Sequence, residues 1–255
     1  MVYDLHRMLR HILNLPTQKR RKRYTITGTT DGFGSQYLAI MSGIAYCESM
    51  NYEYVHTPFS IVDHGQNPNV LNTFIGIPAG DTRRGVDITE LRADPVHNSE
   101  KPSIYYTENI RSRLRAYYFS TAKPAIPPTD IVIHIRRGDV GPHAPDRYTS
   151  NTDYVAIIQM LKATYPNRLI TVHSEGYLDD FKELIPEGVD IRLNDPIAVS
   201  FHCMVMANVL VTAKSGFSYT AGILNKNKVY YIPFWHNPLD DWTVLTSCSA
   251  AQNAA

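Results

Sequence analysis

The chain has 255 residues, of which 44% are hydrophobic and 19% are charged, and its formal net charge is +1. This composition excludes a disordered chain and predicts a soluble globular protein with one large core or two modest ones. A net charge near zero gives no global attraction to nucleic acid or to an acidic surface, so a charged ligand must meet a local patch.

The N-terminal segment predicts an amphipathic helix over residues 1–16, because apolar residues recur at helical spacing and Pro16 stops the pattern. The basic run KRRKR follows at residues 19–23. Such a helix usually covers an apolar groove on its own domain, and peripheral contact with an anionic membrane is the alternative. The segment lacks the apolar core of a signal peptide, and no apolar run approaches the roughly 20 residues that span a bilayer. We therefore expect a cytoplasmic protein.

After the basic run, strand-like and helix-like segments alternate. The pattern predicts a strand at 24–28, a turn at TTDGFGSQ (29–36), a helix at 37–50 and a second strand at 52–57. The following region, residues 58–128, is rich in Pro, Asn, Gly and charge. Loops and short helices are expected there, ending in a linker at 123–130.

From residue 131 onward the alternation becomes regular. Strands are predicted at 131–136, 169–173, 189–193, 209–212 and 229–232, and helices at 152–164, 178–185, 197–207 and 217–224. Short apolar strands separated by helices of this length predict a parallel sheet that is covered on both faces. In such a sheet, ligands bind at the carboxyl ends of the strands.

Charged residues stand at one of these strand ends, in the stretch IVIHIRRGDV (131–140). His134 and Arg136 share a face of the strand, and the planar guanidinium of Arg136 suits phosphate oxygens. Arg137 points the other way or into the loop. For Arg137 and Asp139, an internal ion pair with each other is the alternative to a functional role.

Two strand-turn-helix loops are candidate phosphate cradles. In TAKSGFSYTAG (212–222) a helix begins directly after a strand, so backbone N–H groups, the Ser215 hydroxyl and the helix dipole can meet a phosphate. An ordinary serine N-cap is the alternative. The loop TTDGFGSQ offers Gly32 and Gly34 but lacks the third glycine of a dinucleotide fingerprint. A third segment, HSEGYLDDF (173–181), has small residues that let a ligand approach the backbone.

The sequence contains none of the motifs that are typical of metal-dependent, redox, P-loop or serine-nucleophile enzymes. There is no Asp-x-Asp pair, HExxH, Cys-x-x-Cys, Walker lysine loop or Gly-x-Ser-x-Gly elbow. We therefore expect neither a metal nor a resident cofactor. The three cysteines, Cys47, Cys203 and Cys248, are far apart and lack metal-ligand spacing, which indicates packing residues in a reducing compartment.

Three motifs together resemble the fucosyltransferase superfamily, which includes the α1,2-, α1,6- and protein O-fucosyltransferases. HIRRGD (134–139) looks like the His-x-Arg-Arg motif of this superfamily. DGFGSQYLAIMSGIAYCESMNYEYV resembles its N-terminal glycine-rich loop, helix and second strand, although Ser35 stands where asparagine is usual. NDPIAVSFHCMVMANVLVTAKSGFSYTAGIL resembles its C-terminal motif, in which an acidic residue precedes a helix, a strand and a Ser-Phe-Ser element.

The resemblance implies a GT-B-like α/β fold, in which two Rossmann-like halves face a cleft. We expect the basic helix in residues 1–23, an acceptor-side half in 24–125, a nucleotide-sugar-binding half in 126–245 and a tail in 246–255. The implied function is a metal-independent, inverting glycosyltransferase that moves a sugar from GDP-fucose to a glycan hydroxyl. The same scaffold with a UDP-sugar donor, such as UDP-xylose, is the alternative. A non-catalytic nucleotide- or glycan-binding module, or a nucleic-acid protein directed by KRRKR, is the alternative from another class.

The resemblance also assigns roles to residues. Arg136 is implied to contact the β-phosphate, with His134 beside it, and Ser215, Gly216 and Phe217 to hold the diphosphate and nucleoside. Further donor-binding candidates are Arg137, His173, Glu175, Gly32 and Gly34. The base that deprotonates the acceptor is sought first at Asp139, which matches the motif position, then at His143 in the same loop and at Asp63 in the acceptor half.

Overall fold

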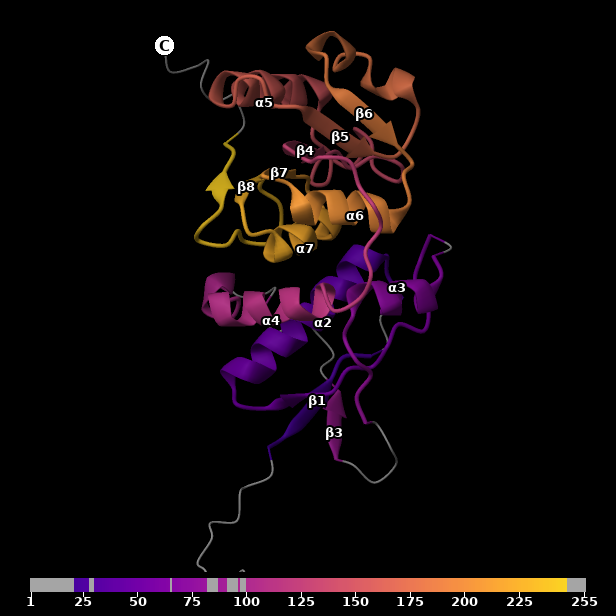
Figure 1. Cartoon of the computed structure of the whole chain (residues 1–255), viewed down its shortest axis with the longest axis vertical. Coiled ribbons are helices and arrows are strands. Elements are labelled where there is room, and N and C mark those ends of the chain that lie inside the picture. The colour runs from indigo at the N-terminus through magenta and orange to yellow at the C-terminus, as the bar shows by residue number, and fades with distance from the viewer. Residues whose placement is uncertain are drawn as a thin grey trace, which may run out of the picture.

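The computed structural model of the chain describes residues 21–27, 30–64, 66–81, 87–90, 96 and 100–246. Within them, two parallel sheets follow one another along the chain and form the lower and upper parts of the molecule in Figure 1. The predicted N-terminal helix and nearly all of the predicted tail lie outside these residues, so the peripheral membrane contact stays a prediction. No helix of the described part is both long and apolar enough to cross a bilayer.

The first half is built on a three-stranded parallel sheet with the order β2-β1-β3. Its strands are β1 (Arg23–Thr25), β2 (Glu53–Tyr54) and β3 (Ile88–Glu90), and its helices are α2 (Phe33–Ser49), α3 (Pro68–Ile75) and α4 (Glu108–Tyr118), with a 3-10 turn η1 (Pro102–Ile104). β3 corrects the prediction of loops and short helices alone in this region. The strand has three residues and none of them is buried, so only its pairing with β1 defines it.

The second half is a six-stranded sheet in which all neighbouring strands are parallel, with the order β6-β5-β4-β7-β8-β9. The strands are β4 (Ile131–His134), β5 (Ile170–Ser174), β6 (Asp190–Leu193), β7 (Val209–Thr212), β8 (Lys228–Tyr231) and β9 (Thr243–Val244). This is the doubly wound Rossmann order, and it reverses between β4 and β7. A ligand crevice is expected at that reversal, at the carboxyl ends of the two strands.

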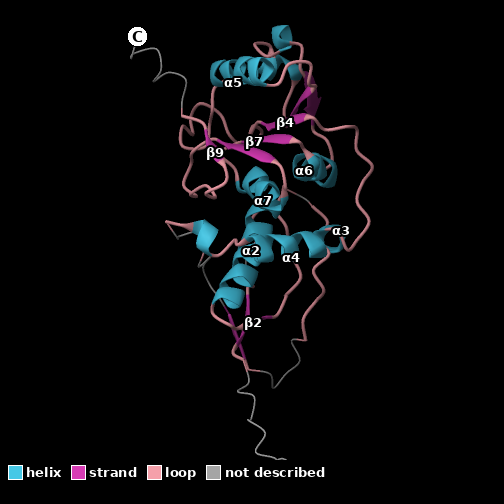
Figure 2. Ribbon diagram, turned by 60° about the vertical axis from the view of Figure 1, so that its left-hand side comes forward, coloured by secondary structure: helices cyan, strands magenta, loops and turns pink. Residues whose placement is uncertain are grey.

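Helices cover both faces of this sheet. α5 (Asn151–Thr164) lies on the outer face, whereas α6 (Ile197–Met206) and α7 (Gly216–Leu224) lie on the face toward the first half. Figure 2 shows α7 between the six-stranded sheet and α2. The GT-B-like α/β architecture predicted from the sequence is therefore confirmed as two parallel sheets stacked through a shared layer of helices.

One predicted helix is wrong. Residues 178–185 form two separate 3-10 turns, η2 (Leu178–Phe181) and η3 (Ile185–Glu187), in place of one α-helix. The break lies at residues 182–184, and Pro186 stands in the first turn of η3, where its missing N–H leaves no bond unmade. The helix predicted at 37–50 also begins earlier, at Phe33, directly after its N-cap Gly32.

A single apolar core joins the two halves. Phe33 of α2, Phe74 of α3 and Tyr118 of α4 surround Phe201 of α6, with ring centroids 5.3, 5.9 and 5.9 Å from that of Phe201. Phe201 is fully buried. Burial of a side chain of this size contributes about 1.5–3 kcal/mol. A second apolar cluster packs on the other face of the six-stranded sheet, under α5.

The N-terminal end of α7 touches α2 at a position where only glycine fits. A Cβ on Gly34 would lie 2.5 Å from the backbone N and Cα of Phe217. The Thr220 hydroxyl, which donates to the carbonyl of Gly216 at 2.6 Å, also lies 3.2 Å from the carbonyl oxygen of Gly34. The two helices therefore approach through backbone contact, which fixes how the halves meet.

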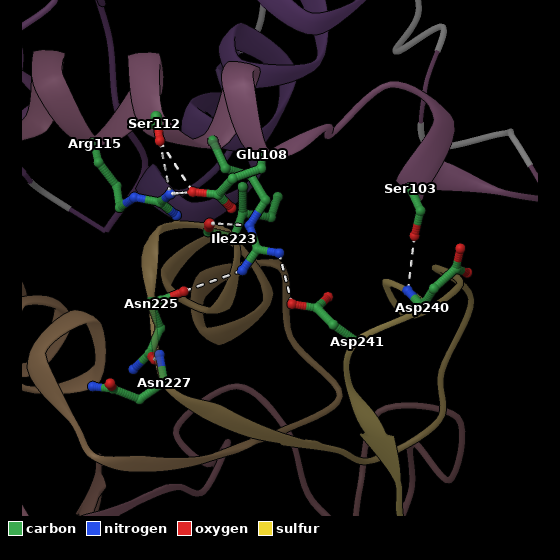
Figure 3. Close-up of polar contacts among 10 residues, drawn as sticks. Ser103, Glu108, Ser112, Arg115, Ile223, Asn225, Asn227, Asp240 and Asp241 are labelled. Atoms are coloured by element: carbon green, nitrogen blue, oxygen red, sulfur yellow. Dashed lines mark hydrogen bonds and ion pairs between the residues drawn. The ribbon is translucent and has the colours of Figure 1, made fainter.

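The C-terminal end of α7 is held by an arginine of α4. Arg111 donates to the carbonyl oxygens of Ile223 and Asn225 at 3.4 and 3.3 Å, and it pairs with Asp241 at 2.7 Å. Figure 3 shows this cluster beneath α4. The last carbonyls of a helix have no partner within the helix, and a guanidinium both satisfies them and complements the negative end of the dipole.

Candidate functional site

A cleft opens at the strand-order reversal of the second sheet, and both halves line it. Its volume is about 310 Å³. The first half contributes Asp31, Gly32, Phe33, Gly34, Ser35, Asp63 and His64. The second half contributes His134, Ile135, Arg136, Arg137, Asp139, Arg147, His173, Ser174, Glu175, Asp195, Ile197, Ser200, Gly216 and Phe217. The structure thus brings together every site residue predicted from the sequence except His143 and Ser215.

The N-terminal ends of α2, α6 and α7 converge on this cleft, since residues from the first turn of each helix line it. No side chain caps α2 after Gly32 or α6 after Pro196. In α7, the Ser215 hydroxyl accepts from the Phe217 N–H at 3.3 Å. Each helix N-terminus carries unpaired N–H groups and about half a positive charge. The cleft is therefore suited to a multiply charged anion.

Arg136 is fixed in a defined position at the cleft. Its Nη2 donates to both carboxylate oxygens of Asp139, at 2.9 and 2.8 Å, and its Nη1 donates to Ser215 Oγ at 3.2 Å. Ser215 is only 2% exposed and does not line the cleft. The Ser215 hydroxyl caps α7 and also accepts a hydrogen bond from the Arg136 guanidinium, so Ser215 positions Arg136 from outside the cleft.

The predicted alternative pairing of Asp139 with Arg137 is wrong, because Asp139 pairs with Arg136. Gly138 turns the chain with a φ of +77°, which brings residue 139 back toward residue 136. Burial acts to raise the pKa of Asp139, but the hydrogen bonds and charge of Arg136 outweigh it and lower that pKa. Asp139 is therefore an ionised partner for Arg136 in the free protein.

Arg137 directs its charge away from Arg136, as predicted, although both residues follow β4 and do not lie on it. It donates to the carbonyl of Arg136 at 2.8 Å, to the carbonyl of Thr149 at 3.1 Å and to the side chain of Asn151 at 2.6 Å. Its guanidinium also lies 4.5 Å from the centre of the Tyr148 ring. These contacts tie the segment after β4 to the start of α5.

Two buried histidines stand side by side where β4 and β5 end. His134 and His173 are register partners, with exposures of 9% and 1%. Burial lowers the pKa of His134 to about 3 and that of His173 to about 4. Among the described residues, no hydrogen-bond partner exists for His134 Nδ1 or for either ring nitrogen of His173. Both are neutral imidazoles at the cleft, and these three unpaired nitrogens are buried.

The histidine of β5 also faces a carboxylate that the sequence analysis left without a role. His173 Nδ1 lies 3.6 Å from Asp195 Oδ2, and Arg192 donates to the same oxygen at 3.0 Å. Asp195 follows β6 and lines the cleft. The residues after β4 were predicted because the carboxyl ends of parallel strands meet at one edge of the sheet. Asp195 could have been predicted in the same way, since it follows β6.

Other lining residues were missed because nothing marks them in the sequence. Asp31 and His64 reach the cleft from loops of the first half, and Arg147 reaches it from the end of the loop after β4. His64 has a positive φ of 62°, which is uncommon outside glycine. Their positions depend on loop conformation, and single-sequence patterns carry little information about it.

The three base candidates occupy different positions. Asp139 lines the cleft from the second half, and Asp63 lines it from the first half, where its Oδ1 accepts from the backbone N–H of His64 at 2.8 Å. His143 is exposed on the loop after β4 and does not line the cleft. Glu175, the other predicted carboxylate, packs so closely against Gly138 that a Cβ there would lie 2.5 Å from its Oε2. Across the described residues, no group of three or more His, Cys, Asp or Glu could hold a metal ion.

No protein-family model and no curated protein matches the sequence. Among solved structures, the chain is similar to POFUT1 in complex with GDP-fucose, with 10% identity and a TM-score of 0.45 over 91% of this chain and 99% of the other. It is also similar to a mutant of Arabidopsis thaliana FUT1 in complex with GDP, with 12% identity and a TM-score of 0.46 over 91% and 76%. A third similar structure is the E. coli heptosyltransferase WaaC with ADP-2-deoxy-2-fluoro heptose, with 11% identity and a TM-score of 0.41 over 88% and 92%.

Proposed function

We propose that this protein is a glycosyltransferase that uses a nucleotide-sugar donor. The observation that carries the proposal is the convergence of three helix N-termini and Arg136 at the strand-order reversal. A nucleoside diphosphate bears the negative charge that such a site attracts. The opposite wall of the cleft belongs to the first half, and we place the acceptor on that side.

We propose an inverting transfer in which the leaving diphosphate is stabilised by protein groups. As the anomeric carbon separates from the donor, negative charge grows on the diphosphate. Arg136 and the start of α7 lie at the cleft, so they can stabilise that charge once the diphosphate has replaced Asp139 as the partner of Arg136. Ser215 serves as a positioning residue for Arg136 in this mechanism, and Gly216 and Phe217 offer the backbone contacts.

The donor is proposed to be GDP-fucose, because the three motifs resemble the fucosyltransferase superfamily. A UDP-sugar stays as the second candidate. His134 and His173 stand at the base of the cleft as buried neutral imidazoles, and we propose that they shape the donor pocket. Cys47 and Cys203 are free and buried, in line with the predicted cytoplasmic location.

The first experiment is a thermal-shift screen of GDP, UDP, ADP and CDP, with and without EDTA. A nucleotide that binds only the folded state at about 100 times its Kd adds about 2.7 kcal/mol of stability, so the melting temperature rises. Release of free sugar from the matching nucleotide sugar would then separate an enzyme from a binding module. If none of the four nucleotides shifts the melting temperature, the proposal is wrong.

The acceptor base is proposed to be Asp139 or Asp63, the two predicted candidates that line the cleft. A donor diphosphate would compete with Asp139 for Arg136 and so release its carboxylate for the acceptor. Asp139→Asn and Asp63→Asn should be compared by kcat and by donor affinity. Loss of the base lowers kcat by about 100-fold or more while the donor still binds. If both variants keep kcat, neither carboxylate is the base, and His143 is the remaining predicted candidate.

A further inference from the structure

Trp235 is 53% exposed and lies against Arg147, a residue that lines the cleft. The other tryptophan, Trp242, is only 6% exposed and packs against Tyr219, with ring centroids 4.9 Å apart. Trp235 lies in the loop that follows the carboxyl end of β8, the same sheet edge at which the cleft opens. An exposed tryptophan at the edge of a ligand cleft is a common contact for a ligand that has an apolar face.

The connection between Trp235 and the cleft is Arg147. The guanidinium of Arg147 lies 5.5 Å from the Trp235 ring centre, and Arg147 lines the cleft together with Asp139. A molecule that extends out of the cleft past Asp139 therefore meets Arg147 first and the tryptophan next. Arg147 offers hydrogen-bond donors and Trp235 offers an apolar ring, a combination that suits a polyhydroxylated ring with C–H groups on one face.

The loop that carries Trp235 is held rigidly by the core. The Tyr219 hydroxyl donates to the carbonyl of Asn237 at 2.7 Å, and the Tyr231 hydroxyl donates to the carbonyl of His236 and accepts from the Phe234 N–H at 3.2 Å. The indole N–H of Trp235 is itself satisfied, because it donates to His236 Nε2 at 3.1 Å. A ring fixed in this way loses little conformational entropy when a ligand stacks on it.

We infer that Trp235 and Arg147 form a subsite for the acceptor glycan, in which a sugar ring next to the reacting unit stacks on the indole. This inference rests on the proposed function, in which the sugar unit of the acceptor that reacts lies at Asp139. The subsite recognises a pyranose ring of the acceptor, whereas the helix N-termini and Arg136 recognise the donor. Donor affinity and acceptor affinity should therefore respond to different substitutions.

The test measures binding of the full chain to a glycan array in the presence of GDP, for the wild type and for Trp235→Ala, Trp235→Phe and Phe119→Ala. Phe119 is a matched control, because it is 46% exposed and packs on the adjacent Tyr118 at 5.0 Å, much as Trp235 packs on Phe234 at 4.9 Å. The glycans bound by the wild type should bind about tenfold more weakly to Trp235→Ala. Trp235→Phe, which keeps a ring, should retain part of the affinity, and Phe119→Ala should retain all of it.

A second readout uses the two tryptophans directly. In Trp242→Phe the only indole is Trp235, so a glycan found on the array should shield its fluorescence from acrylamide, whereas GDP alone should not. The inference is overturned if the wild type binds no glycan, or if Trp235→Ala binds the same glycans equally well. The proposed function is wrong if no nucleoside diphosphate stabilises the protein. That result is independent of this test, because glycan binding that depends on Trp235 could still be observed.

Discussion

At the scale of single residues, Arg136 is the side chain on which donor binding depends most directly. Arg136→Ala removes charge-assisted hydrogen bonds worth about 1.5–3 kcal/mol, so the Kd for the nucleoside diphosphate should rise by about 10- to 150-fold. Titration calorimetry measures this change. Arg113→Ala is the control, since Arg113 is a half-exposed arginine that pairs with Glu48 away from the cleft. Equal affinity in Arg136→Ala and the wild type would remove Arg136 from the site.

The two buried histidines predict how stability depends on pH. Their pKa values are about 3 for His134 and about 4 for His173, lowered mainly by burial, against about 6.5 in an unfolded chain. Below pH 6.5 the unfolded chain therefore binds protons that the folded protein does not, and the free energy of unfolding falls as the pH falls from 7 to 4. His56 and His236, whose pKa values burial also lowers, act in the same direction.

Urea unfolding between pH 7 and pH 5 isolates the contribution of one histidine when the wild type is compared with His173→Gln. Glutamine does not titrate, so the variant should lose less stability over this interval, by on the order of 1 kcal/mol per pH unit. Parallel pH profiles for the two proteins would show that His173 does not stay neutral in the folded state.

At the scale of secondary-structure elements, the contact of α2 with α7 is the one in which an added methyl group should destabilise the protein most. Gly34→Ala places a methyl group 2.5 Å from the Phe217 backbone, so the helices must separate. Overpacking of this kind costs about 1–3 kcal/mol, and a lower melting temperature in calorimetry would report it. Gly216→Ala is the matched control from the facing helix, because its nearest neighbour would lie at an ordinary 3.7 Å. Equal melting temperatures for the two variants would contradict the close contact.

The elements that the sequence predicts well are those whose own residues define them. Val209–Thr212 is four buried residues in a row, and its predicted bounds match β7. β3 and β9 escape prediction because they have only two or three residues, none of them buried, which become strands only through pairing with β1 and β8. The same contrast holds in the site: Arg136 is predicted from its place at a strand end, whereas its partnership with Asp139 depends on the left-handed turn at Gly138.

At the scale of the whole molecule, the halves share one hydrophobic cluster that contains residues of α2, α3 and α4 as well as α6 and α7. The boundary between an acceptor-side half (24–125) and a donor-side half (126–245) remains a prediction. Because the apolar contacts cross that division, the two halves should unfold together. A single calorimetric transition whose van't Hoff and calorimetric enthalpies agree is the expected result. Two separated transitions would show that each half is stable alone.

The segment between α4 and β4 contrasts with that shared cluster. Residues 121–130 contain no helix or strand, and none of them is buried. Ile126 packs against the shared cluster and Lys123 lies over the Tyr118 ring, so the backbone can be cut with little loss of packing only where neither is displaced, as at the exposed Pro127 and Pro128. A single protease nick there should leave the two fragments associated, whereas each fragment expressed alone would expose the apolar faces of α2 or α6. The molecule should consequently behave as a natural split protein, in which two polypeptides produced together reconstitute the cleft without a covalent link.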